Sequence, residues 1–210
     1  TNASQATSIL QTADGGAANI SNILTRMKSL ASESASGTVT DSSRVYIQAE
    51  FSQLSSEIDS IASGTSYSGQ NLLDGTSAFA TGVNVLVGSS SADSVNVTIA
   101  NLSVASLGIG GLDVSTETGA TAAMTTLDTA INTVSAARAT IGAQESRFNF
   151  SANSISTQTQ NLQGANSAIT DVDVAQEEAT LSSAMVKTQA AVSAETAANQ
   201  MPQYLLKLLG

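Results

Sequence analysis

The chain has 210 residues, enough for one or two domains, with 11% charged residues, 3% aromatic residues and a formal net charge of −10. Its seven Lys and Arg residues are spread along the sequence, so we expect no nucleic-acid partner, and no apolar run is long enough to predict membrane insertion. The absence of Cys and His excludes disulfides, Cys–His and Ser–His–Asp nucleophiles and almost every zinc site, and we expect no metal, no cofactor and no catalytic residue.

Residues 4–36 are predicted to form a helix that faces a core. Apolar and small residues recur there at alternating spacings of four and three, beside a second ladder with a spacing of seven. Together they make an apolar face about three residues in seven wide, as a core-facing bundle helix requires. The chain begins abruptly inside this helix, so we expect an N-terminal segment to be missing. The face consists of Ile9, Ala13, Gly16, Ile20, Ile23, Met27, Leu30 and Ser34, and the ladder of Leu10, Ala17, Leu24 and Ala31.

A polar turn over residues 38–41 leads to a second predicted helix at 42–63. Thr40 or Asp41 is a suitable N-cap for it. A turn this short between two long helices predicts an antiparallel hairpin. Glu57 and Asp59 point to different faces of the helix, so we interpret them as solvated carboxylates rather than as an acid–base pair. The apolar positions are Ile47, Phe51, Leu54, Ile58 and Ile61.

Residues 64–112 are predicted to consist of loops and one β-hairpin. Residues 83–87 and 94–99 alternate or run in β-branched side chains, and the Gly- and Ser-rich stretch between them is typical of a turn. Residues 102–112 are glycine-rich and predicted to be irregular. The apolar anchors of the loops are Tyr67, Leu72 and Leu73.

The longest regular pattern covers residues 120–162 and predicts a coiled-coil helix. Its period of 3.5 residues favours a left-handed coiled coil, and at ~1.5 Å per residue the helix would be about 65 Å long. The polar members Arg138, Glu145 and Thr159 are interpreted as register-fixing positions in the seam. The stripe runs through Ala120, Met124, Leu127, Ile131, Val134, Arg138, Ile141, Glu145, Phe148, Ala152, Ile155, Thr159 and Leu162. The fold class predicted is mainly α: an elongated antiparallel helical bundle or coiled-coil rod with a small β-hairpin region.

The C-terminal part is predicted to be a separate helix with an apolar tail. The long helix should fade near Gly164, and Asp171 or Asp173, with Gln176, would cap a new helix over residues 174–199 that Pro202 interrupts. An apolar tail exposed on a monomer is unfavourable. We therefore prefer its burial in a larger assembly, or by a chaperone, to its folding back on its own domain. The predicted assembly residues are Leu205, Leu206, Leu208 and Leu209.

Short motifs, in order along nearly the whole chain, resemble those of bacterial flagellins. The N-terminal half contains Gln11-Thr12-Ala13-Asp14-Gly15-Gly16, Asp41-Ser-Ser-Arg44, Ile47-Gln48-Ala49-Glu50 and Thr65-Ser-Tyr67-Ser-Gly69-Gln-Asn-Leu72-Leu73. The C-terminal half contains Arg138-Ala-Thr-Ile-Gly142-Ala143-Gln-Glu-Ser-Arg147, Asp171-Val-Asp173-Val-Ala175-Gln-Glu177 and Ala198-Asn199-Gln200-Met-Pro202-Gln203. The resemblance implies a minimal flagellin that lacks outer domains and the N-terminal partner of its innermost coiled coil.

The resemblance also implies a domain organisation and a structural function. Residues 1–75 and 119–170 would be the N- and C-terminal helical parts of the rod domain, residues 76–118 its β-hairpin and irregular segment, and residues 171–210 the C-terminal helix of the inner terminal coiled coil. The implied function is a self-assembling structural subunit of the flagellar filament for motility. The unfolded subunit would be exported through the flagellar type III channel and would be located outside the cell.

Implied partners are other flagellin subunits, an export chaperone, and hook-associated or cap proteins. Some flagellins are also sensed by an innate immune receptor, and Arg26, Leu30 and Glu50 align with that surface, where they can equally make inter-subunit and core contacts. Ser29 stands where recognised flagellins usually carry an acidic residue.

Three alternative functions belong beside the filament subunit. A flagellin-like surface adhesin could bind polysaccharide, although the aromatic residues are too few and scattered to predict a sugar pocket. A hook–filament junction protein would share the terminal coiled coil, but the motif from Arg138 to Arg147 favours flagellin itself. A hydrolase would need two carboxylates at a fixed separation, and the sequence contains no such constellation.

Overall fold

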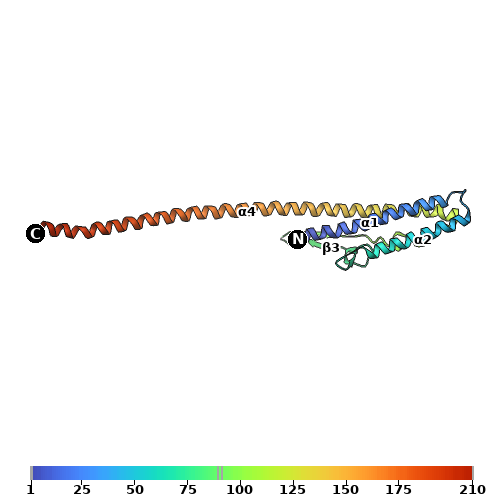
Figure 1. The fold of residues 1–210 in the computed structure, drawn as a ribbon, viewed down its shortest axis with the longest axis horizontal. Coiled ribbons are helices and arrows are strands. Elements are labelled where there is room, and N and C mark those ends of the chain that lie inside the picture. The colour runs from blue at the N-terminus through green and yellow to red at the C-terminus, as the bar shows by residue number, and fades with distance from the viewer. Residues whose placement is uncertain (1, 89, 91, 210) are drawn as a thin grey trace. The chain divides into compact units, whose positions relative to one another are not determined.

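The computed structural model describes residues 2–88, 90 and 92–209, without the side chains of residues 171–173. The chain divides into two compact units, residues 1–155 and 156–210. The protein is mainly α, as predicted, with two short antiparallel β-pairs. The elements, labelled in Figure 1, are α1 (Asn2–Ser34), α2 (Asp41–Gly64), β1 (Ser66–Tyr67), β2 (Gln70–Asn71), the 3-10 helix η1 (Ala78–Ala80), β3 (Val83–Leu86), β4 (Ser94–Val97), α3 (Val104–Leu107) and α4 (Glu117–Leu209).

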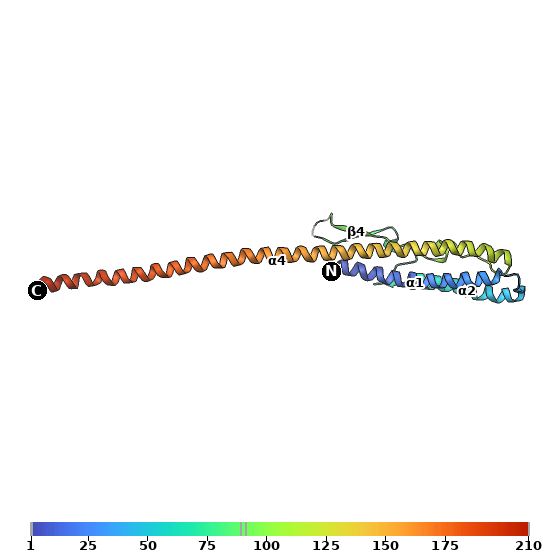
Figure 2. The same cartoon turned by 90° about the horizontal axis from the view of Figure 1, so that it is seen from above.

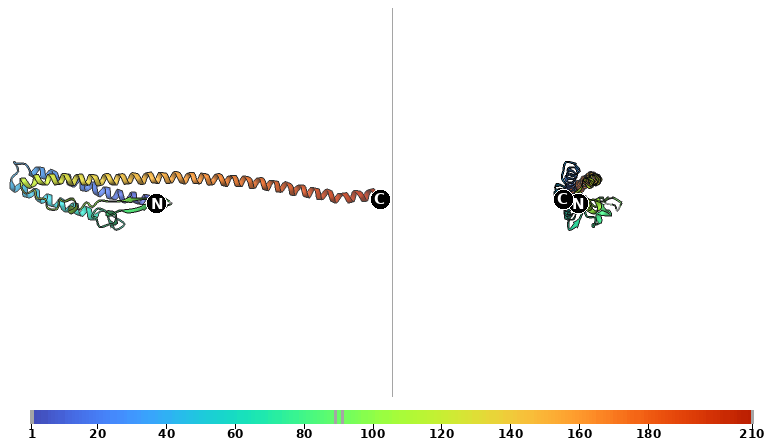
Figure 3. Two further views of the ribbon diagram at one scale, coloured as in Figure 1. Left: turned by 180° about the vertical axis from the view of Figure 1, so that it is seen from behind. Right: turned by 90° about the vertical axis from the view of Figure 1, so that its right-hand side faces the viewer.

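Helix α1 lies at the centre of the first unit, with α2 and the first part of α4 alongside it (Figures 1 and 3). The face predicted for α1 is confirmed: all its members are buried except Ile9 and Ile23, which are half-buried against the core. On α2, Ile47, Phe51 and Ile58 are buried as predicted. Because three helices share this interior, the first unit has one continuous hydrophobic core.

Helix α4 packs on α1 through a seam that differs in part from the predicted one. Alternate members of the predicted stripe are buried as predicted: Ala120, Leu127, Val134, Ile141 and Phe148. The intervening seam positions, however, are one residue earlier than predicted: Ala123, Ala130, Ala137 and Gln144 are buried in place of Met124, Ile131, Arg138 and Glu145. Small Ala side chains allow the helices to approach closely, and the longer side chains then pack along the edge of the contact.

The turn between α1 and α2 is held by a buried arginine. Arg44 Nε donates to the Ser34 carbonyl oxygen at 2.8 Å, Nη2 donates to the Ser36 carbonyl oxygen at 3.0 Å, and Nη1 donates to Asp41 Oδ1 at 2.8 Å. Thr40 is the N-cap of α2, one of the two predicted candidates. The guanidinium therefore satisfies carbonyl groups at the C-terminal end of α1 that have no partner within the helix.

Residues leading into α4 join the same end of the bundle. Ser34 Oγ donates to the carbonyl oxygen of Val114, and the N–H of Val114 donates to Gln48 Oε1 at 2.7 Å. These hydrogen bonds connect α1, α2 and the segment before α4. We call the four residues Ser34, Arg44, Gln48 and Val114 the end clamp.

The predicted hairpin is present as β3 and β4, which pair antiparallel with Val83 opposite Val97. Figure 2 shows it beside the first part of α4. The segment predicted to be irregular contains the short helix α3, and Asp59 Oδ1 accepts a hydrogen bond from the Val104 N–H at 2.8 Å. Asp59 is exposed, as predicted for a solvated carboxylate, and it also satisfies a free donor of that helix.

Helix α4 continues where two breaks were predicted. It passes through Gly164 and through Pro202 and ends at Leu209. A glycine inside a helix costs only about 1 kcal/mol relative to Ala, which the surrounding helix-forming residues can offset. The capping role predicted for Asp171 and Asp173 lies outside the described side chains, although their backbone is helical. The division of the chain into the four predicted domain segments stays a prediction.

Candidate assembly surface

Residues 156–170 and 174–209 present large apolar side chains to solvent. Helical proteins normally bury such side chains, and contiguous exposed apolar surface marks an interaction site. Polar neighbours such as Thr170 and Thr188 bond only to the backbone of their own helix. The exposed set comprises Leu162, Ile169, Val174, Leu181, Met185, Val186, Val192, Met201, Tyr204, Leu205, Leu206, Leu208 and Leu209.

Part of this exposed set continues the ladder that is buried in the first unit. From Ala120 onward, every seventh residue of α4 is apolar as far as Ile169. Phe148 is fully buried, Ile155 is partly exposed, and Leu162 and Ile169 are 64% and 68% exposed. A ladder with a spacing of seven is the packing face of a coiled coil. Leu162 and Ile169 therefore have the spacing and apolar character of a coiled-coil seam, and no helix in the described part of this chain covers them.

The tail residues predicted for assembly are exposed, and together they form a broad surface. Leu208 and Leu209 are each 88% exposed, the most of any large apolar side chains in the described residues. At about 100° per residue, Leu205, Leu206, Leu208 and Leu209 cover an arc of about 160° of the helix. A strict two-helix seam is narrower than this. Such an arc fits contact with more than one neighbouring helix.

The second set of predicted residues is only partly brought together. Arg26 on α1 and Glu50 on α2 form an exposed ion pair, with Arg26 Nη2 at 2.6 Å from Glu50 Oε1. Leu30, predicted for the same surface, is buried in the core with 2% exposure. Its burial agrees with the core contact that the sequence analysis allowed for it, since it lies on the α1 face that packs inside the bundle. A role of the three residues in contacting a partner stays a prediction.

Two further ion pairs connect α1 to α4 in the first unit. Lys28 Nζ lies 2.5 Å from Asp128 Oδ1, and the Arg138 guanidinium binds both carboxylate oxygens of Asp14, with Nε at 2.8 Å from Oδ1. The hydrogen bond to Asp14 raises the pKa of Arg138. Burial, and then the charge of Asp14, raises the pKa of Glu145. These groups border the seam and fix how α1 and α4 face each other.

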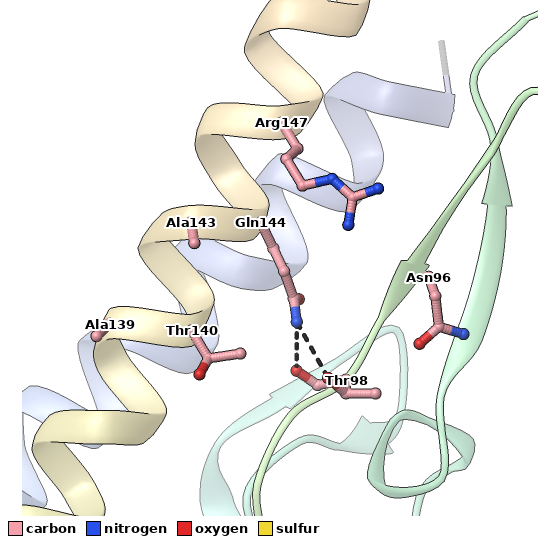
Figure 4. Close-up of a pocket in the computed structure, with 7 residues that line it drawn as sticks. All are labelled: Asn96, Thr98, Ala139, Thr140, Ala143, Gln144 and Arg147. Carbon is pink, nitrogen blue, oxygen red and sulfur yellow. Dashed lines mark hydrogen bonds between the residues drawn. The ribbon is translucent and has the colours of Figure 1, made fainter.

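The described residues contain no candidate metal site. No group of three or more Asp or Glu side chains is placed to hold a metal ion among them. No helix in this part of the chain is both long and apolar enough to cross a membrane. A groove of about 530 Å³ between β4 and α4 is lined by amide, hydroxyl, methyl and guanidinium groups (Figure 4).

The first unit is a heptad-packed bundle, and its longest helix continues with an exposed apolar ladder. These features are typical of helical structural proteins that assemble with other chains. Family comparison then gives the particular family. Residues 1–78 match the bacterial flagellin N-terminal helical region, and residues 124–209 match the bacterial flagellin C-terminal helical region. The chain belongs to the bacterial flagellin family, and its function is that of a structural filament subunit.

Individual relatives and solved structures agree with this family. The flagellar filament 30.7 kDa core protein of Treponema maltophilum is 33% identical over 96% of this chain and 75% of its own length. Flagellin of Listeria monocytogenes is 32% identical over 99% and 77%. The crystal structure of Bacillus cereus flagellin has a TM-score of 0.65 at 32% identity, covering 78% of this chain and 93% of that one. A putative flagellar hook-associated protein from Vibrio parahaemolyticus, at 14% identity, TM-score 0.62 and coverage of 76% and 84%, shares the fold.

Proposed function

We propose that this chain acts outside the cell as a filament subunit that packs against other flagellin subunits through the apolar side chains of residues 156–209. The supporting observation is the ladder of α4, whose members are buried as far as Phe148 and exposed at Leu162 and Ile169. Burying a Leu or Ile side chain contributes about 1.5–3 kcal/mol. Covering this ladder with helices of a homopolymer would therefore supply a large driving force for assembly.

The tail is the second part of the proposed interface. Leu205, Leu206, Leu208 and Leu209 would lie between neighbouring subunits, since their arc is too wide for a single helix partner. The same side chains would favour aggregation before assembly, so we propose that an export chaperone covers them until the subunit reaches the hook-associated and cap proteins at the growing end.

Arg26 and Glu50 are the accessible remainder of the predicted receptor surface. Both are exposed on adjoining helices, and each can exchange its ion-pair partner for a group on another protein. We propose that they contact either a neighbouring subunit or an innate immune flagellin receptor. We also propose that the chain has no enzymatic activity, in keeping with a structural family.

Electron microscopy of the full-length protein added to flagellin filament seeds tests the filament proposal. We expect long helical filaments from the unaltered protein and none from a variant with Leu205, Leu206, Leu208 and Leu209 all changed to Ser. Lys207→Ser is the matched control, because it alters the same segment without removing apolar surface, and it should still extend the seeds. A Leu-to-Ser variant that elongates seeds normally would refute the assembly role of the tail.

A further inference from the structure

A second surface of the first unit has the features of a peptide-binding groove. It lies between the outer edge of β4 and helix α4 (Figure 4). Its volume is about 530 Å³, and its α4 wall is formed largely by the small side chains of Ala139, Thr140 and Ala143. The β4 wall contains Asn96 and Thr98. An extended chain beside β4 needs about 4.8 Å between strand axes, so small residues on the facing helix favour its entry.

Among the residues that the structure describes, the main-chain groups of β4 that face this groove have no strand partner. Along a strand, successive residues direct their N–H and C=O groups to opposite sides. Asp93 C=O accepts from the Val87 N–H, and the Ile99 N–H donates to the Phe79 carbonyl oxygen. The odd-numbered residues therefore direct their main-chain N–H and C=O groups toward β3 and its neighbours. Thr98 C=O faces α4, because it accepts from Gln144. The Ser94 C=O, both groups of Asn96 and the Thr98 N–H therefore line an open sheet edge.

Gln144 holds this edge at a fixed distance from α4. Its Nε2 donates to both the carbonyl oxygen and Oγ1 of Thr98, each at 3.1 Å (Figure 4). The side chain is well buried, with the residue 7% exposed. A buried amide with two hydrogen bonds is costly to move, so the groove is preformed rather than opened by a ligand.

Arg147 gives the groove a charge preference. Its side chain extends from α4 toward β4 in Figure 4. The other basic residues of the described part of the first unit each form an ion pair with a carboxylate: Arg26, Lys28, Arg44 and Arg138. Arg147 has no such partner among the residues that the structure describes. In a chain with a net charge of −10, this unpaired guanidinium beside an open strand edge favours an acidic ligand.

We propose that this groove binds an extended, acidic peptide segment of another protein. The segment would add to β4 as an antiparallel third strand, exchanging main-chain hydrogen bonds with Asn96, and would place a carboxylate against Arg147. The chain's own loops offer no such segment in the described residues. Their carboxylates accept hydrogen bonds within their own turns: Asp74 from Thr76, Asp93 from Ser90 and Asp113 from Ser115. The site is distinct from the filament interface of residues 156–209.

Calorimetric titration of the 210-residue chain with the probe peptide acetyl-Thr-Val-Glu-Val-Thr-amide tests this proposal. We expect saturable binding that weakens about tenfold when the glutamate of the peptide is replaced by glutamine, as loss of one charge-assisted hydrogen bond predicts. The variant Arg147→Gln should bind the glutamate peptide about tenfold more weakly too. Lys187→Gln is the matched control, because it makes the same change in net charge at an exposed position of the second unit.

Two further measurements test the strand addition itself. Amide NMR shifts should change at Asn96 and Thr98 when the peptide binds, and a peptide methylated on its main-chain nitrogens should not bind, because it lacks the donors. Each of four results would overturn the proposal: no binding, equal binding of the glutamate and glutamine peptides, equal weakening by Arg147→Gln and Lys187→Gln, or full binding of the methylated peptide. Filament formation need not change in any of these experiments.

Discussion

The two units of this flagellin contain consecutive parts of one helix but differ in what covers it. In residues 2–155, the ladder of α4 is buried against α1 as far as Phe148, and ion pairs such as Arg138 with Asp14 border the seam. In residues 156–209, the apolar residues that follow are exposed. The same heptad chemistry therefore stabilises the fold in one unit and is left free for assembly in the other. A heptad pattern by itself does not tell which of these two uses a segment has.

The largest expected effect comes from one substitution in each unit at equivalent ladder positions. Phe148→Ala should lower the free energy of unfolding of the unassembled chain by about 3–5 kcal/mol, because it removes a fully buried aromatic ring. Leu162→Ala should change it by less than about 0.5 kcal/mol, because the side chain is exposed. Urea unfolding followed by circular dichroism measures both. Equal losses would show that the ladder of the second unit is already covered in the monomer.

The next effect concerns the end clamp of the first unit. Arg44→Ala should destabilise the chain by about 2–3 kcal/mol, since the Ser34 and Ser36 carbonyl groups lose charge-assisted hydrogen bonds. Arg44→Lys should recover only part of this loss, because an ammonium group cannot reproduce the planar donor pattern. Thermal unfolding of both variants provides the comparison. An alanine variant as stable as the unaltered chain would mean that water replaces these bonds at no cost.

Substituting one glycine in each unit distinguishes the effect of close packing on stability from the effect of helix propensity. A Cβ at Gly16 would lie 2.5 Å from Thr65 Oγ1 and 2.7 Å from Leu73 Cδ1, so Gly16→Ala should destabilise the chain by about 1–2 kcal/mol. A Cβ at Gly164 would meet no atom within 4 Å, so Gly164→Ala should instead stabilise α4 by about 1 kcal/mol. Denaturation midpoints should move in opposite directions. A shift of the same sign for both would contradict the packing argument at Gly16.

The smallest expected effect is a pH dependence in the first unit. Burial and the charge of Asp14 raise the pKa of Glu145, so the folded state binds its proton more tightly than the unfolded state does. Stability from this group is therefore complete below the ordinary glutamate pKa and is lost as the pH rises through the raised value. Glu145→Gln should remove that part of the pH dependence and make the chain slightly more stable at pH 7. Unfolding curves measured from pH 4 to 7 would show it, and an unchanged slope would exclude it.

Much of the fold can be predicted from the sequence because its helices follow strong heptad patterns. The buried face of α1 and the hairpin of β3 and β4 were predicted nearly residue by residue. The seam of α4 was predicted only in part, because Met124 and Ile131 are more hydrophobic than the buried Ala123 and Ala130 beside them. A regular alanine at every seventh position was the available signal. It indicates close helix approach rather than strong hydrophobicity.

The functional surfaces were less predictable, for different reasons. The apolar tail is visible in sequence because four leucines lie within five residues, although its role in assembly stays a prediction. Leu30 could not be separated from Arg26 and Glu50 without knowing which face of α1 is covered. Asp59 and Gln144 act on residues 45 and 46 positions away along the chain, and no local pattern reports such pairs.

The end clamp also bears on how the first unit responds to mechanical load. Ser34, Arg44, Gln48 and Val114 connect three segments at the end where α1 terminates. At the opposite end, Asn2 contributes one exposed hydrogen bond, from its Nδ2 to the Leu86 carbonyl oxygen. Local opening begins where few buried contacts hold the backbone. We therefore expect a shearing force on the bundle to separate α1 first at its N-terminal turn. The hydrogen bonds of the end clamp should break last.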